Sequence, residues 1–189
     1  MSTLPIPRPH TWDTLQKSRN IAAIATLTTG LSSHNPQLRH LCLKSLIVRK
    51  EEAAKQAVIL HWECFDEQDL EILRADARQF VDIAKRLLTQ GNLSEKRAAL
   101  TAIATLDLSD SIDVVLDIVV NPRHALCQQA TTCLVDMCQR WGKLARNGKD
   151  VPSIRTQMLE KLHKQLVLFP VHKNMHIVDG ANHMSLYDG

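Results

Sequence analysis

Aromatic residues and glycine are scarce in this chain of 189 residues, and the scarcity excludes several classes of function. Aromatics make up 4% of the residues, so the hydrophobic core is predicted to be aliphatic. The six glycines do not cluster, and the chain has neither a glycine-rich phosphate loop nor a Gly-x-Ser-x-Gly nucleophile elbow. We therefore predict no enzyme, and no catalytic or cofactor-binding residue.

Long hydrophobic runs are also missing. The most apolar stretches, residues 21–27 and 112–120, are too short to cross a membrane. The first ten residues contain three prolines and lack the apolar segment of a secretory signal. The five cysteines have irregular spacings that do not suggest a disulfide framework. These features predict a reducing, cytoplasmic location and no membrane association.

The hydrophobic content of 44% is that of a globular protein, and apolar residues recur mainly at helical spacing. We predict an extended N-terminal arm over residues 1–10, a helical domain over residues 11–169, and a tail or linker over residues 170–189. Histidines in this last segment, with Asp179 nearby, do not make a convincing metal site because prolines and glycines disfavour a helix there.

The periodicity predicts an all-α protein of about eight helices. They are expected over residues 11–29, from Pro36 through Leu46, and over 51–65, 70–88, 93–106, 112–120, 121–146 and 154–168. A buried strand is the alternative for residues 112–120, given their valines.

Capping residues set the expected ends of these helices. Asn35 and Asn121 are expected to cap helices with proline at the first position, and Asn92 pairs with Glu95 in a capping box. Gly30 and Gly91 are expected to stop the helices that precede them. Residues 66–69 are predicted to form a break or a cap.

One helical pattern recurs three times. Counted from its first apolar register position, each copy has small residues at +4 and +7 and a large aliphatic residue at +8. The copies are Leu38, Cys42, Ser45 and Leu46; Glu95, Ala99, Ala102 and Ile103; and Leu126, Ala130, Cys133 and Leu134. These offsets share one helix face, and small side chains there allow a partner helix to approach closely.

The first copy also carries Asn35-Pro36 and Leu38-Arg39, and it resembles the second helix of a HEAT repeat, a member of the armadillo-type helical repeats. The second copy departs from that family at Glu95, and the third has Cys127 in place of the arginine. The resemblance implies a right-handed α-solenoid of antiparallel helical hairpins. An irregular helical bundle is the alternative.

Solenoids present long ridges of exposed helix, which suit extended protein partners. The resemblance therefore implies a scaffold or adaptor module that mediates protein–protein interaction without catalysis, with a partner that the sequence does not name. The chain's C-terminal end lacks a capping helix, so we also expect either a longer protein or a homodimer through that end.

A basic segment supports an alternative function. Between residues 137 and 175 the chain has eight basic and two acidic residues. The candidate surface consists of Arg140, Trp141, Lys143, Arg146 and Lys149. HEAT-like DNA glycosylases combine tryptophan and basic residues similarly, so this surface is a candidate for nucleic acid, by base stacking and phosphate contacts. A solvated helix face with Trp141 packed inside is the other interpretation.

A metal site is not expected from the cysteines. Cys127, Cys133 and Cys138 share one helix, but residues five or six apart point in different directions. The outer two stand about 16 Å apart along the helix axis. Cysteines in the small slots of the recurring pattern are therefore predicted to be packing residues.

Overall fold

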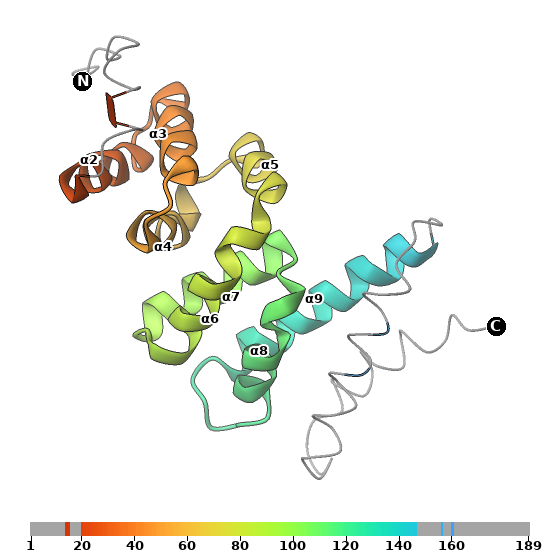
Figure 1. The fold of residues 1–189 in the computed structure, drawn as a ribbon. Coiled ribbons are helices and arrows are strands. Elements are labelled where there is room, and N and C mark those ends of the chain that lie inside the picture. Colours follow the sequence, from red (N-terminus) through yellow and green to blue (C-terminus); the bar gives the residue numbers. More distant parts are fainter. Residues whose placement is uncertain (1–13, 16–19, 147–155, 157–159, 161–189) are drawn as a thin grey trace. The chain divides into compact units, whose positions relative to one another are not determined.

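The computed structural model describes residues 14–15, 20–146, 156 and 160, and these residues are helical or lie in turns, with no strand among them (Figure 1). The all-α prediction is confirmed for this part of the chain. Residues 112–120 form a helix and not the alternative strand. The predicted N-terminal arm, most of the helix over 154–168 and the tail lie outside the described residues.

Eight α-helices and three short 3₁₀-helices follow one another within residues 20–146. They are α2 (Ile21–Leu31), α3 (Pro36–Val48), α4 (Glu52–Leu60), η1 (Trp62–Cys64), α5 (Glu67–Ala75), η2 (Ala77–Phe80), α6 (Val81–Gln90), α7 (Leu93–Leu106), η3 (Ser109–Ser111), α8 (Ile112–Val119) and α9 (Cys127–Arg146).

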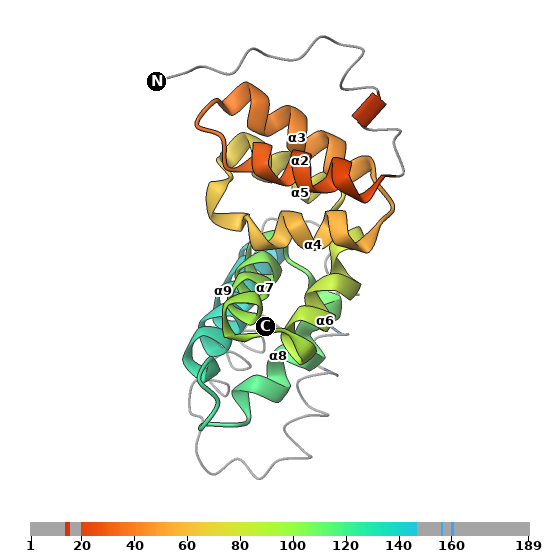
Figure 2. The ribbon, with the colours of Figure 1, turned by 90° about the vertical axis from the view of Figure 1, so that its left-hand side faces the viewer.

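The chain divides into two compact units, residues 1–83 and residues 84–189. In the first unit, α2 and α3 pack together as a helical hairpin joined by a four-residue turn, α4 contacts both helices, and α5 contacts α3 (Figures 1 and 2). Aliphatic side chains fill this unit: Leu27, Leu31, Leu43 and Leu46 are at most 1% exposed. The aliphatic core predicted from the composition is therefore present.

In the second unit, α9 packs against both α7 and α8. Most apolar side chains of α8, including Ile112, Val115 and Leu116, are buried. The outward residue Asp113 forms an ion pair with Lys85 of α6 at 3.1 Å.

Three of the predicted caps are confirmed. The Asn35 side chain accepts the backbone N–H of Gln37 at 3.0 Å, with Pro36 at the first helical position. Asn92 and Glu95 form the expected capping box, in which each side chain accepts the other residue's N–H. Residues 66–69 form a second capping box, between Asp66 and Asp69. Each cap satisfies N–H groups that a helix start leaves without partners.

The prediction that Gly30 stops the first helix is wrong. The helix continues through Leu31, and Gly30 lies where α2 meets α3. A Cβ atom at Gly30 would stand 2.2 Å from the Sγ of Cys42. A side chain at position 30 would therefore force the Cys42 side chain to move, because α2 and α3 approach closely here. Gly91, by contrast, follows α6 as predicted, with its N–H bonded to the carbonyl of Leu87.

The start of α2 also differs from the prediction of one helix over residues 11–29. Asn20 has an extended backbone, and its side chain accepts the N–H of Ala22 at 2.9 Å. It is therefore an N-cap that begins α2 at Ile21 and separates this helix from the helical residues Thr14 and Leu15.

The single helices predicted over 51–65 and 70–88 are wrong, because each is broken. α4 ends at Leu60, and the chain turns through η1. α5 ends at Ala75, and a 3₁₀ turn, η2, precedes α6. Leu73 and Phe80 are both fully buried on either side of that break. An apolar pattern indicates which residues are buried. A tight turn that keeps the same residues buried does not change that pattern, so the break cannot be predicted from it.

The predicted helix start at Asn121-Pro122 is wrong as well. The Asn121 side chain accepts the N–H of Arg123 at 3.2 Å in a turn. The first helical residue is Cys127, and His124 accepts the N–H of Leu126 through Nδ1 at 3.1 Å. Asparagine favours turns as well as helix caps through the same short-range hydrogen bond, and here the turn prevails.

The packing role of the recurring pattern is confirmed. All six residues at the small positions are at most 4% exposed: Cys42, Ser45, Ala99, Ala102, Ala130 and Cys133. The aliphatic residues at +8 are also buried. The Cys133 thiol lies 3.7 Å from the carbonyl oxygen of Leu100 in α7, which shows how closely α9 approaches that helix.

Two glycines test whether close approach determines the packing of these helices. Gly30→Ala is expected to lower the free energy of unfolding by about 1–3 kcal/mol, because the methyl group meets Cys42. In a Cys42→Ala background the same change is expected to cost less. The measurement is a double-mutant cycle by urea unfolding. An equal loss of unfolding free energy in both backgrounds would show that the contact between residue 30 and Cys42 does not affect stability.

Gly142 in α9 is the matched control. A Cβ atom there meets nothing within 4 Å. Gly142→Ala is expected to raise the free energy of unfolding by about 0.5–1 kcal/mol, because alanine favours the helix.

Candidate interaction surface

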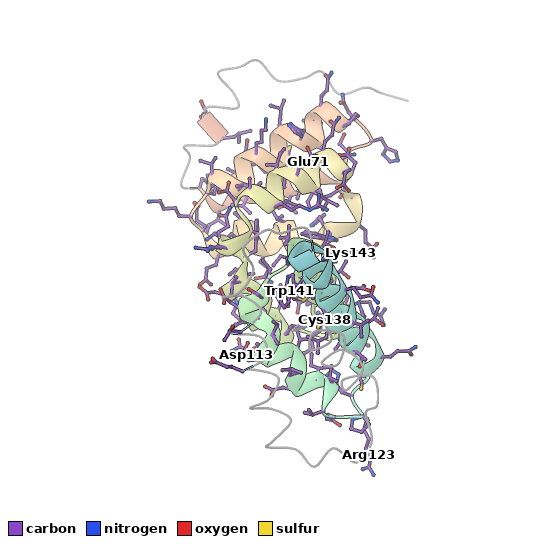
Figure 3. The ribbon with its side chains drawn as sticks, turned by 90° about the vertical axis from the view of Figure 1, so that its right-hand side faces the viewer. Glu71, Asp113, Arg123, Cys138, Trp141 and Lys143 are labelled. Atoms are coloured by element: carbon purple, nitrogen blue, oxygen red, sulfur yellow. The ribbon has the colours of Figure 1, made fainter. Side chains whose placement is uncertain are left out.

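The predicted basic surface on α9 is only partly exposed. Trp141 is 4% exposed, while Lys143 is exposed (Figure 3). Residues two apart on a helix point to roughly opposite sides, about 200° around the axis. The side chain of Arg146 and all of Lys149 lie outside the described residues. The structure thus separates Trp141 from its basic neighbour, and the nucleic-acid alternative stays a prediction.

Arg140 connects α9 to the end of α7. Its guanidinium donates to the carbonyl oxygen of Ala104 and, at 2.9 and 3.1 Å, to the carboxylate of Asp107. Asp107 has a left-handed backbone with φ of 55° and directly follows α7. A cation placed on the last carbonyls of a helix offsets the negative end of its dipole. The contacts of Arg140 are therefore structural.

Arg39 and His40 connect α3 to the start of α5. Arg39 forms ion pairs with Asp66 and, at 2.7 Å, with Asp69, whose carboxylate is 1% exposed. The Nδ1 atom of His40 lies 3.2 Å from the other oxygen of Asp69. The bond from the Asp69 N–H lowers the pKa of Asp66, with Arg39 adding to the effect. This cluster neutralises Arg39, the arginine in the first copy of the recurring pattern, inside the first unit.

Arg49 is buried at the open end of the α2–α3 hairpin. It donates to the carbonyl oxygen of Leu15 at 2.8 Å and of Asn20 at 3.4 Å, and it pairs with Glu51 at 2.8 Å. Its Nε atom is buried without a hydrogen-bond partner. The bond to Asn20 places the start of α2 beside the end of α3.

The five cysteines are free thiols. Desolvation by burial raises the pKa of Cys42 and of Cys138 to about 11, and that of Cys133 to about 12. A thiol held protonated is a poor nucleophile and a poor metal ligand. Within the described residues no group of three or more histidine, cysteine or acidic side chains could hold a metal ion.

The outward face of α2 is a helix surface without charged residues. Its exposed residues are Ile21, Ala22, Ala25, Thr26 and Thr29, and they lie opposite the buried residues Ala23, Ile24, Leu27 and Leu31. Among the helices of the described residues, α2 is the one that contains no charged side chain. Soluble helix faces usually carry charge, so this face differs from an ordinary solvated surface.

The threonines of α2 add little polarity to this face. The hydroxyls of Thr26, Thr28 and Thr29 donate to the carbonyl oxygens four residues earlier, at 2.8–3.1 Å. Each hydroxyl proton is therefore used within the helix. A partner helix that covers this face need not supply acceptors for these hydroxyl protons.

Two large aliphatic side chains, one on α2 and one on α3, are exposed at the open end of the hairpin. Ile21 is 76% exposed and Val48 is 68% exposed. They follow Asn20 and precede Arg49, which are hydrogen-bonded to each other, so they lie at the same end. We call Ile21, Ala22, Ala25, Thr26, Thr29 and Val48 the α2 face.

Sequence reasoning missed the α2 face although a signal was present. The run Ile21–Leu31 contains no charged residue. No described helix is long and apolar enough to span a bilayer. Comparison of the chain with models of protein families, with curated proteins and with solved structures finds no match.

Thiol chemistry tests the burial of the cysteines. With iodoacetamide at pH 8, Cys42, Cys133 and Cys138 are expected to react at least tenfold more slowly than Cys64 and Cys127, which are half-buried. The reason is the small thiolate fraction of a thiol whose pKa is raised. Peptide mass spectrometry resolves the five sites, and fast labelling of Cys133 in the folded protein would contradict the packing assignment.

The same raised pKa values give a pH dependence. Unfolded thiols lose their protons above about pH 8.5, while Cys42, Cys133 and Cys138 stay protonated in the folded chain. Above about pH 8.5 the folded state then binds more protons than the unfolded state. The free energy of unfolding is therefore expected to fall as the pH rises toward 12. Replacing all three with alanine, measured in urea between pH 7 and pH 10.5, should flatten this decline.

Substitution of Arg140 separates a structural role from a binding role. Arg140→Gln is expected to lower the free energy of unfolding by about 1 kcal/mol, because Asp107 and the α7 carboxyl end lose a charged donor. Lys143→Gln, on the exposed side of α9, is the control, and its effect should stay within about 0.5 kcal/mol. Equal effects of the two substitutions in urea unfolding would contradict the assignment.

Proposed function

We propose that this protein is a HEAT-like helical-repeat adaptor that binds another protein and performs no catalysis. The observation that carries the proposal is the α2 face, where exposed aliphatic and small residues lie on α2, a helix without charge, and Val48 of α3 is exposed at the same end of the hairpin. Exposed apolar surface of this kind marks interaction sites in proteins, because leaving it in water is unfavourable.

The buried small residues of the recurring pattern support the repeat assignment. In two of its copies the small slots receive a neighbouring helix at close range, at Cys42 in the first unit and at Cys133 in the second. We propose that the hairpins stack as a right-handed α-solenoid, in which each hairpin covers the apolar face of the next. The α2 face then has the composition of a stacking face and lacks the polar surface of a terminal repeat.

A reducing compartment such as the cytoplasm suits the proposed protein. All five thiols are free, and the most buried ones, Cys42 and Cys133, fill packing positions. Disulfides form in oxidising compartments, where unpaired cysteines are uncommon.

Site-specific cross-linking tests the adaptor proposal. A photo-reactive amino acid at Ala25, in the α2 face, is expected to cross-link a discrete protein in extracts of the source cell. The same amino acid at Thr132, an exposed small residue on α9, is the matched control and should not. The discrete product should also disappear when Thr26 and Thr29 are both changed to glutamine, which adds bulk to the face without charge.

Two results would contradict the proposal. Cross-linking of equal strength at Ala25 and Thr132 would show nonspecific contact. A product that survives the glutamine changes, in protein with an unchanged helical circular-dichroism spectrum, would show that the face is not the contact.

A further inference from the structure

The charge around the α2 face indicates which kind of partner it fits. Residues 21–50, which form α2, α3 and their connections, contain no aspartate or glutamate. Four basic residues lie in the same stretch: Arg39, Lys44, Arg49 and Lys50. The net charge of the hairpin is therefore positive, although acids are abundant in the segment that follows it.

The structure divides these four basic residues into two pairs. Arg39 and Arg49 are largely buried, and they are neutralised by acids from outside the hairpin, Asp66 and Asp69 for the first and Glu51 for the second. Lys44 and Lys50 are exposed, and neither forms an ion pair within the described residues. The hairpin thus presents two lysines to solvent and has no acidic residue of its own to balance them.

The two exposed lysines lie close to the apolar part of the face. Lys44 is one helical turn before Val48 on α3, and Lys50 is two residues after it. Val48 and Ile21 share the open end of the hairpin, as the bond between Arg49 and Asn20 shows. Basic residues therefore border the exposed aliphatic pair.

The small side chains of the face determine the shape of the partner. Ala22, Ala25, Thr26 and Thr29 fall on one side of α2 and have the spacing of a helix-packing stripe. In this protein, such small residues receive another helix, as where Gly30 meets Cys42. The shape suits a rod about as wide as a helix, with an apolar stripe.

We propose that the α2 face and its flanking Lys44 and Lys50 bind an acidic amphipathic helix of a partner protein. The apolar stripe of that helix covers Ile21, Ala25 and Val48, and its carboxylates pair with the two lysines. Electrostatic complementarity sets the orientation and the association rate, and apolar burial contributes most of the affinity. This inference rests on the proposed adaptor function, and it adds the chemistry of the partner.

Synthetic peptides test the proposal without knowledge of the natural partner. The probe is a fluorescent 18-residue helical peptide with an alanine-leucine stripe flanked by glutamates, and the matched control peptide has lysines in place of the glutamates. By fluorescence anisotropy with the full chain at 50 mM salt, we expect the acidic peptide to bind at least tenfold more tightly. Its affinity should fall as salt is raised.

Protein variants separate the contribution of shape from that of charge. Ala25→Gln should lower the affinity for the acidic peptide at least tenfold, and the affinity that remains should still depend on salt. The double substitution Lys44→Gln and Lys50→Gln should lower the affinity for the acidic peptide and remove most of its dependence on salt. Thr132→Gln, an equally conservative change on α9, should alter neither.

Four outcomes would overturn the inference. The two peptides could bind equally, the acidic peptide could bind without loss in Ala25→Gln, or it could fail to bind at all. Binding to vesicles of anionic lipid in preference to the peptide would also overturn it, in favour of a membrane surface. If cross-linking at Ala25 succeeds while the acidic peptide fails, the adaptor function stands and the acidic character of the partner is wrong.

Discussion

Close approach between helices is the constraint on which this structure depends. At Gly30 the helices α2 and α3 come so near that a single methyl group would meet Cys42. Small side chains also occupy the buried positions Ala99, Ala102 and Cys133. Close-packed interiors tolerate little added volume, so the identity of these residues is set by size and not by chemistry. The cysteines among them are therefore protonated packing residues.

Arginine supplies the second kind of connection within each unit. Arg39, Arg49 and Arg140 each join elements that are distant in sequence, by pairing with acids or with backbone carbonyls. Their planar guanidinium groups donate several hydrogen bonds at once, which suits partly buried sites. Because Arg39 and Arg49 are used internally, Lys44 and Lys50 are the exposed lysine or arginine residues among the described residues 20–50. The internal ion pairs thereby shape the surface as well as the core.

The proposed binding surface is what the packing of the first unit leaves uncovered. α2 buries one side against α3 and α4, and its other side has no charge to keep it solvated. Its threonine hydroxyls are turned back onto the helix, so the exposed surface is closer to apolar than its composition suggests. A surface of this kind favours a second helix over a small polar ligand.

The sequence by itself determined the helical class, most of the caps and the buried small positions. These features depend on local hydrogen bonds and on periodicity, as at Asn35 and in the box formed by Asn92 and Glu95. Tertiary structure decided where Gly30 lies, where the chain breaks after Ala75, and that Trp141 faces inward. Those outcomes depend on which helix lies beside which, and a periodic pattern says that a face is buried without saying against what. The α2 face belongs to the same category, because an apolar run becomes a binding surface only when the fold leaves one of its sides open.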